Sequence, residues 1–164
     1  MRSVAEAIAA CDPDVVCVHG IDPGDALALA TRFARGYAYR GSQALLWKPA
    51  FAAREVHDRY LPGVPLRPFD RRGILQVDGA IEHRRCALVA TQFSHERDAY
   101  VRELRFARRV VRSIDGAVAA FVAGMTPAVR AIGFADLGIR ELAFEGGVFI
   151  GGRGAGGSSA IVKV

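Results

Sequence analysis

The fold of this chain is indicated most clearly by the stretch RRCALVATQFSHERDAYVRELRFARRVVRSI, which runs from Arg84 to Ile114. Its residues 86–90 form a continuous apolar run, which is typical of a strand covered on both faces. Ser94 then offers a side-chain oxygen that can cap the free amides of a new helix. In that helix apolar residues recur at steps of three and four, opposite a row of arginines: Arg102, Arg105, Arg109 and Arg112. The stretch therefore predicts a buried strand followed by a long helix with one core face and one basic face.

The patterns outside this stretch predict an α/β layered sandwich with mixed, largely antiparallel sheets. We expect one helix at residues 2–10 and a second that begins at the cap Asp22 and ends near Gly36. The second helix is expected to carry Ala26, Leu27, Ala30 and Phe33 inward. Residues 49–72 are expected to form a surface loop, in which 52–60 could be a helix. Asp78-Gly79 predicts the tight turn of a hairpin. Further strands are expected at residues 15–18, 37–39, 44–47, 73–77, 118–122, 139–144, 148–150 and 160–164.

The composition fits a single globular domain that spans residues 1–164. Three cysteines, at positions 11, 17 and 86, form no C-x-x-C pair, so we expect reduced thiols in a cytoplasmic protein. The N-terminal segment carries Glu6 and lacks a long apolar core, which argues against a signal peptide. An apolar run of about 18 residues, as needed to span a membrane, is absent from the sequence.

The net charge of +5 comes almost entirely from arginine, because only Lys48 and Lys163 are lysines among the 22 basic residues. The guanidinium group matches phosphate well, so nucleic acid is one candidate partner. The same bias can reflect an arginine-rich genome, and charge alone does not favour that partner. The basic face of the long helix could bind phosphates in the same way, although such a face is more often simply solvated.

One small cluster could carry acid–base or metal chemistry. His19 ends a predicted strand and is followed closely by Asp22 and Asp25. Imidazole and carboxylate groups are ordinary metal ligands. The competing interpretation is a strand-end histidine followed by a helix cap, and it is favoured because Asp22 already has that structural role.

Six segments follow one another in a characteristic order: PDVVCVHGID (13–22), YAYRGSQALLW (37–47), GILQV (73–77), CALVATQF (86–93), AAFVAGM (119–125) and GGSSAIVKV (156–164). This order resembles the endonuclease/exonuclease/phosphatase family, whose members have the deoxyribonuclease I-like fold. The resemblance implies a divalent-metal phosphodiesterase site at the ends of the strands. In the family this site contains a glutamate, a histidine, an aspartate with an asparagine, and a C-terminal Asp-His pair.

Carried over to this chain, the resemblance places a different residue at each of these positions. They are held, in chain order, by Gly20, Gln92, Met125, Pro127, Ser159 and Ala160. None of these side chains can bind a hard cation through a carboxylate or take up a proton at neutral pH. The family's opening strand also has no counterpart before Met1.

Three hypotheses follow. The first is a non-catalytic member of this fold without a cofactor, acting as a binding or scaffold module for a partner protein or as a homodimer that covers an exposed sheet edge. The second is a Mg²⁺- or Mn²⁺-dependent phosphoesterase or nuclease with displaced ligands, namely His19, Asp22 and Asp25, with Asp136 or Glu145 as additions. The third is a nucleic-acid or phospholigand binder that uses the arginine-rich helix.

Overall fold

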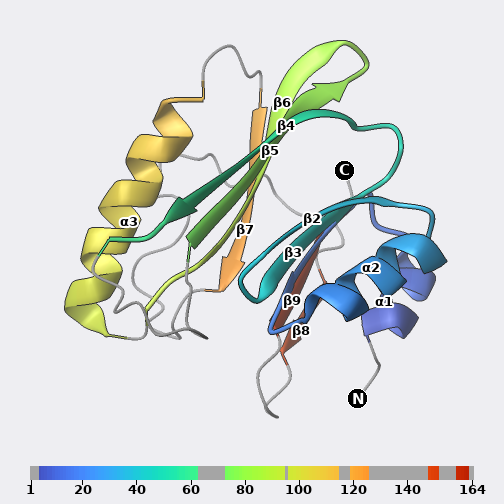
Figure 1. Ribbon diagram of the computed structural model, residues 1–164, viewed down its shortest axis with the longest axis horizontal. Helices are drawn as coiled ribbons and strands as arrows, with labels where there is room; N and C mark the ends of the chain where they lie inside the picture. Colours follow the sequence, from blue (N-terminus) through green and yellow to red (C-terminus); the bar gives the residue numbers. More distant parts are fainter. Residues whose placement is uncertain are drawn as a thin grey trace.

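The computed structural model describes residues 4–62, 73–94, 96–114, 119–125, 148–151 and 158–162. In this part of the chain two sheets lie face to face, and helices cover their outer faces (Figure 1). Sheet A has the strand order β2-β3-β1-β9-β8, and sheet B has the order β4-β5-β6-β7. Each pairing within the two sheets is antiparallel except that of β6 with β7. The predicted α/β sandwich with mixed, largely antiparallel sheets is therefore confirmed.

Most of the observed strands begin and end within one or two residues of the predicted positions. Sheet A consists of β1 (Val15–His19), β2 (Gly36–Arg40), β3 (Gln43–Trp47), β8 (Val148–Gly151) and β9 (Ser158–Val162). Sheet B consists of β4 (Ala52–Tyr60), β5 (Gly73–Ile81), β6 (Arg84–Gln92) and β7 (Ala119–Met125). The helices are α1 (Val4–Cys11), α2 (Pro23–Arg32) and α3 (Arg97–Arg112). The strand expected at 139–144 lies outside the described residues.

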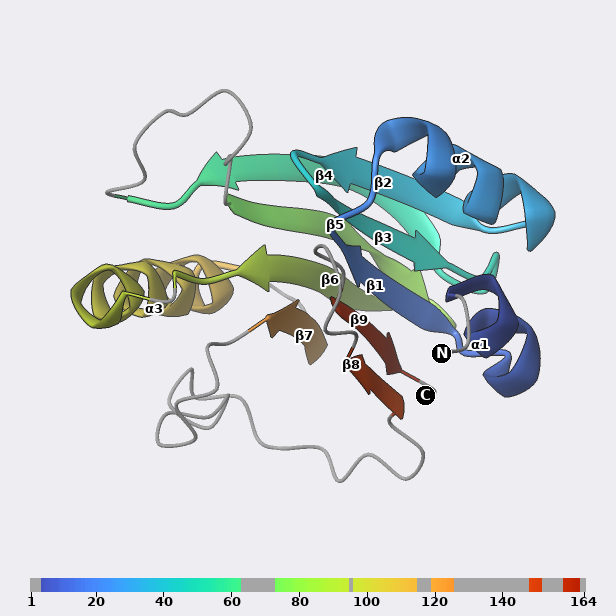
Figure 2. The ribbon, with the colours of Figure 1, turned by 90° about the horizontal axis from the view of Figure 1, so that it is seen from below.

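Three apolar clusters hold these layers together. The cluster between the sheets includes Val15 and Leu45 from sheet A and Leu75 and Leu88 from sheet B. A second cluster packs α1 and α2 on the outer face of sheet A, and a third packs α3 on the outer face of sheet B. Figure 2 shows α3 on the side of the molecule opposite to α1 and α2. The described helices include none that is both long and apolar enough to cross a membrane.

The start of α2 is confirmed, whereas its end and its core face differ from prediction. Asp22 accepts a hydrogen bond from the backbone N of Asp25 at 2.9 Å, as the cap position requires. The helix ends at Arg32, short of the expected Gly36. Leu27, predicted to face the core, is 49% exposed. Ala26 and Ala30, which were also predicted to face the core, are buried, and Phe33 is partly buried. Residues four apart share a face, whereas Leu27 lies a third of a turn away.

The possible helix at 52–60 is wrong, because these residues form β4. This strand pairs antiparallel with β5 from Ala52 opposite Ala80 to Tyr60 opposite Gly73. β4 lies at the edge of sheet B, and most of its side chains are exposed. An edge strand that is exposed in this way lacks the alternation of apolar and polar residues that would reveal it in the sequence.

The hairpin between β5 and β6 turns later than predicted. Asp78 and Gly79 lie within β5, and the turn falls at Glu82 and His83, whose φ angles are 49° and 67°. Two successive residues with positive φ are typical of a type I′ turn. Gly79 is needed for close packing instead, because an added Cβ would lie 2.5 Å from Ala52 O.

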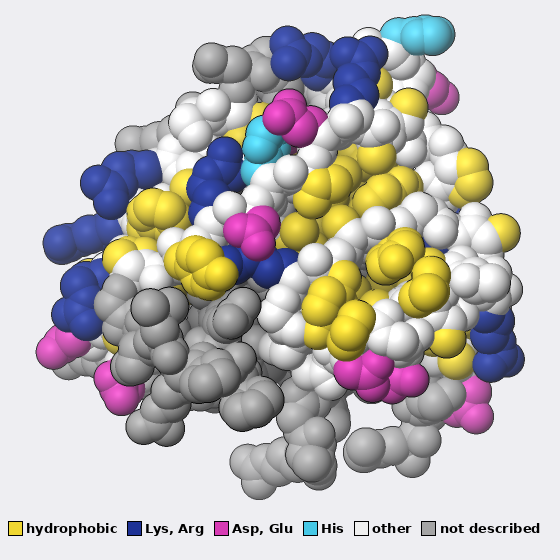
Figure 3. Space-filling model, viewed as in Figure 1, with side chains coloured by type: hydrophobic (Ala, Val, Ile, Leu, Met, Phe, Trp, Pro, Cys, Tyr) yellow, Lys and Arg dark blue, Asp and Glu magenta, His cyan; other side chains and the backbone are white. Residues whose placement is uncertain are grey.

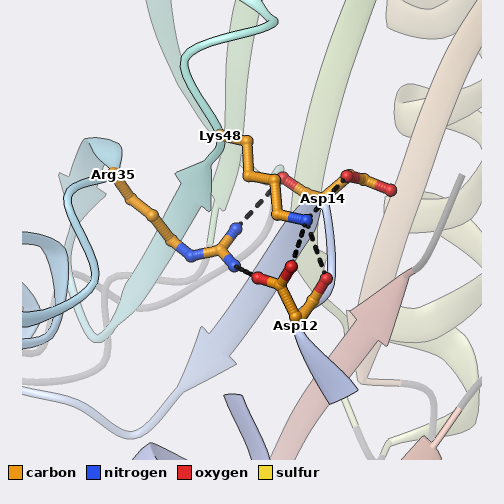
Figure 4. Close-up of polar contacts among 4 residues, drawn as sticks. All are labelled: Asp12, Asp14, Arg35 and Lys48. Atoms are coloured by element: carbon orange, nitrogen blue, oxygen red, sulfur yellow. Dashed lines mark hydrogen bonds and ion pairs between the residues drawn. The ribbon is translucent and has the colours of Figure 1, made fainter. Parts of the chain in front are cut away.

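A group of ion pairs ties the start of β1 to its neighbours (Figure 4). Lys48 Nζ lies 2.8 Å from Asp12 Oδ2 and 3.2 Å from Asp14 Oδ1, and Arg35 Nη2 lies 3.3 Å from Asp12 Oδ1. Lys48 follows β3 and Arg35 precedes β2, so the group joins the turn before β1 to both of these strands. The hydrogen bond that Lys48 Nζ donates to the Asp12 carboxylate is the main reason that the pKa of Lys48 is raised.

Two substitutions test where the hairpin turns. His83→Gly removes a Cβ from a residue with a φ of 67°, so we expect a gain of about 0.5–1 kcal/mol in the free energy of unfolding. Gly79→Ala forces a Cβ against Ala52 O and Phe51 Cζ, and we expect a loss of about 1–3 kcal/mol. Urea unfolding measures both values. A loss in the free energy of unfolding for His83→Gly together with a gain for Gly79→Ala would instead place the turn at Asp78-Gly79.

Candidate functional site

The C-terminal ends of β1 and β6 lie at the same end of the sandwich. His19, the last residue of β1, is opposite Gln43 in sheet A. The Gln43 side chain crosses to sheet B, where Nε2 donates to Gly73 O at 3.1 Å. Gly73 begins β5, whose next residue pairs with Thr91 near the end of β6. This end of the sandwich is at the bottom of Figure 1, where the arrowhead of β7 also lies.

The positions at which the family resemblance expects catalytic groups converge on this end. Gly20 directly follows β1, and Met125 is paired with Gln92 at the ends of the parallel strands β7 and β6. Ser159, near the start of β9, is opposite Val18. Ala160 is one residue further along β9, opposite Cys17, and Pro127 lies outside the described residues. The topology thus brings these positions together although their side chains differ from the family's.

Gly20 has a backbone role of its own. Its φ is 71°, in the left-handed region that favours glycine, and its N donates to Ser42 O at 2.6 Å. The backbone N of Ile21 donates to the same oxygen at 3.2 Å. These bonds turn the chain from β1 into α2. A glutamate at this position would have to adopt the same strained conformation.

His19 is enclosed between the sheets and is 2% exposed. Its Nε2 lies 3.3 Å from Cys17 Sγ, and its Nδ1 has no hydrogen-bond partner among the residues that the structure describes. Burial lowers the pKa of His19 to about 4 and raises the pKa of the Cys17 thiol to about 12. At neutral pH both side chains are therefore uncharged. The free, buried state expected of Cys17 and Cys86 is confirmed.

The carboxylates near His19 are directed elsewhere. The Asp22 carboxylate caps α2, and the hydrogen bond from the backbone N of Asp25 is the main reason that its pKa is lowered. Asp22 and Asp25 are both exposed, whereas His19 is buried. Within the described ranges, no three or more His, Cys, Asp or Glu side chains form a group that could hold a metal ion. His19, Asp22 and Asp25 are thus not arranged as a metal site.

Sequence reasoning missed Arg40, which joins the two sheets at this end. The strand predicted at 37–39 stops before it, but Arg40 closes β2 and is 5% exposed. Its Nε lies 2.8 Å from Asp58 Oδ2 in an ion pair without hydrogen-bond geometry, and its Nη1 donates to Arg59 O at 3.1 Å. The guanidinium also lies 4.2 Å from the ring centroid of Tyr60. Alternation with the buried Ala38 is the signal that could have predicted an inward-facing Arg40.

The basic face of α3 lies away from this end, on the outer side of sheet B. Arg102, Arg105 and Arg109 are exposed there, while nothing is described of the side chain of Arg112. Ser94 Oγ accepts from the backbone N of Glu96 at 3.1 Å, just before the first helical residue. This bond reaches Glu96, the residue before α3, rather than an amide within the helix, so it differs from the cap that was predicted.

The buried His19 predicts a specific pH dependence of stability. Its pKa is below the ordinary value of 6.5, so the unfolded chain takes up a proton between about pH 6.5 and 4 while the folded chain does not. The free energy of unfolding should therefore decrease as the pH is lowered through this range, and His19 should contribute up to about 3 kcal/mol of this decrease. The measurement is urea unfolding at several pH values for the native chain and His19→Asn, with His83→Gly as control. Equal pH slopes for the native chain and His19→Asn would contradict the prediction.

Comparison with known proteins gives structural but no sequence matches. No protein-family model matches the chain, and no curated protein sequence does so significantly. Truncated TDP2 from Caenorhabditis elegans matches with a TM-score of 0.59 and 19% identity over 74% of this chain. TDP2 from D. rerio in complex with a single-strand DNA product matches with a TM-score of 0.58 and 14% identity over 96% of this chain. The catalytic domain of human Nocturnin with a bound sulfate anion matches with a TM-score of 0.55 and 14% identity over 74% of this chain.

The matched region covers only part of these proteins. The chain spans 52% of the C. elegans TDP2 structure, 74% of the D. rerio structure and 54% of the Nocturnin domain. All of them have the same fold, and the TM-scores of 0.55–0.59 show that this chain shares it although the identities are only 14–19%. This chain therefore has the fold of the endonuclease/exonuclease/phosphatase family, the deoxyribonuclease I-like fold.

Proposed function

We propose that this chain is a non-catalytic protein of the endonuclease/exonuclease/phosphatase fold that acts as a binding module. The observation that carries the proposal is the chemistry at the ends of β1, β6, β7 and β9. Four of the expected catalytic positions meet there, and they hold Gly20, Gln92, Met125 and Ser159. The described residues at this end contain no group of carboxylates comparable to a metal site.

Metal-assisted hydrolysis of a phosphodiester has requirements that these residues do not meet. It needs a hard cation held by carboxylate oxygens, a group that activates or positions water, and positive charge on the phosphoryl oxygens. Gln92 can donate a hydrogen bond but cannot accept a proton at neutral pH. Arg40, a cation at this end, is buried and already paired with Asp58. Loss of a single catalytic group can lower a rate by several orders of magnitude.

The competing function is a phosphoesterase with displaced ligands. It would use His19, Asp22 and Asp25, with Asp136 and Glu145 lying outside the described residues. The burial of His19 and the capping role of Asp22 both weigh against it. Activity that depends on these residues would overturn the proposal.

A hydrolysis assay separates the two functions. With bis(p-nitrophenyl) phosphate and Mg²⁺ or Mn²⁺, we expect no metal-dependent turnover above that of buffer. If turnover occurs, two variants trace it. Asp22→Asn removes the carboxylate but keeps a good helix cap, whereas Asp22→Ser also keeps the cap and has no amide. Metal-dependent turnover that disappears in both variants, while their far-UV circular dichroism is unchanged, would establish the displaced-ligand enzyme.

A further inference from the structure

We propose that the exposed arginine row of α3, formed by Arg102, Arg105 and Arg109, binds the phosphate backbone of nucleic acid without reading its sequence. This inference rests on the binding role proposed above and names the class of partner. The three side chains are exposed and follow one another at steps of three and four. They therefore form one line along the helix, about 10 Å long. Figure 3 shows Lys and Arg side chains gathered at the left of the molecule, where α3 lies in the same view of Figure 1.

No acid in the described part of the chain forms an ion pair with this row. The ion pairs found there join Lys48, Arg35 and Arg40 to aspartates and His57 to Asp78 and Glu55. In contrast to these groups, the arginines of the row have no ion-pair partner among the described residues. The guanidinium of Arg109 lies 5.9 Å from the ring centroid of Phe106, in the same helix. The arginines of the row are consequently free to contact an external anion.

The sequence of α3 places only one exposed acid, Asp98, near the row, four residues before Arg102. The helix contains only two acids, Asp98 and Glu103. Asp98 lies in the first turn, and Glu103 is 0% exposed and accepts a hydrogen bond from the backbone N of Ser94 at 2.6 Å. A solvated helix face commonly mixes both signs so that i, i+4 pairs form. Here the exposed positions from 102 to 109 that carry charge are all positive.

The surroundings of the row favour a nucleic acid over a membrane or an acidic protein. The apolar side of α3 packs on sheet B through Tyr100, Ala107 and Val110, so no apolar face remains to enter a lipid layer. The row consists of arginine, whose planar guanidinium binds phosphate through two parallel hydrogen bonds. Evenly spaced like charges match the repeating phosphates of a nucleic-acid strand.

The packing of α3 also limits the type of contact. The helix lies flat on sheet B and buries one full side, so it cannot project into a groove and read base edges. Contacts are then confined to the backbone. Such binding is independent of sequence and falls steeply with salt.

The test is fluorescence anisotropy of the full chain with a short labelled oligothymidylate, and with a mixed-sequence oligonucleotide of equal length. We expect equal affinity for both and a slope of log K against log salt of about −2, from three phosphates at about −0.7 each. Arg102→Gln/Arg105→Gln/Arg109→Gln should weaken binding by about tenfold or more and remove most of the slope. Arg105→Gln alone should give a smaller loss, and it keeps the test informative if the triple variant is unstable.

The matched control is Arg54→Gln/Arg84→Gln/Arg85→Gln, which changes the net charge equally at exposed sites outside α3. It should change the affinity by no more than about twofold. No binding at low salt, or equal weakening by the two triple variants, would overturn the proposal. Tighter binding to phosphatidylserine vesicles or to polyglutamate than to either oligonucleotide would also overturn it. Cleavage of a bound oligonucleotide would refute the non-catalytic role but not the binding surface, so the two failures are distinguishable.

Discussion

The two sheets face each other across an apolar layer to which β1, β3, β5 and β6 contribute their inward-facing side chains. Burying each large aliphatic side chain there stabilises the fold by roughly 1.5–3 kcal/mol. At one end this layer becomes polar. His19 continues the inward side of β1, Gln43 that of β3, and Arg40 that of β2. Gln43 and Arg40 reach across to sheet B and fix the distance between the sheets where the family's catalytic site would lie.

The separation of the apolar layer from its polar end is compatible with the proposed non-catalytic role. The apolar layer depends on residues within the strands, whereas catalysis depends on a few residues at their ends. The end residues of this chain have structural roles instead. Gly20 turns the backbone at a φ of 71°, and His19 is a neutral, enclosed side chain. Restoring a glutamate at residue 20 would therefore cost backbone strain as well as create an acid without partners.

How well the sequence predicts the structure depends on how local each determinant is. The buried strands β1, β3 and β6 and the start of α2 follow from short apolar runs and from one capping aspartate, and they were predicted correctly. β4 was missed because an edge strand exposed on most of its length is defined by its partner strand, and no local pattern reports that partner. The hairpin turn was misplaced because Asp78-Gly79 has strong local turn chemistry, while the tight contact at Gly79 becomes visible only in three dimensions. Arg40 was missed for the same reason, since its partners lie about twenty residues away in sequence.

The two sides of α3 are subject to different constraints. Its inner side must fit sheet B, which determines Tyr100, Ala107 and Val110 and accounts for the inward Glu103. Its outer side is not constrained by the fold, and lysine, glutamate or glutamine would serve there equally well. A row of like charges instead lowers helix stability slightly, by about 0.2–0.5 kcal/mol for the pair Arg105 and Arg109. Neither packing nor the expected catalytic end of the sandwich accounts for that row. The proposed anionic partner would account for it, because its negative charges would offset the repulsion between the arginines.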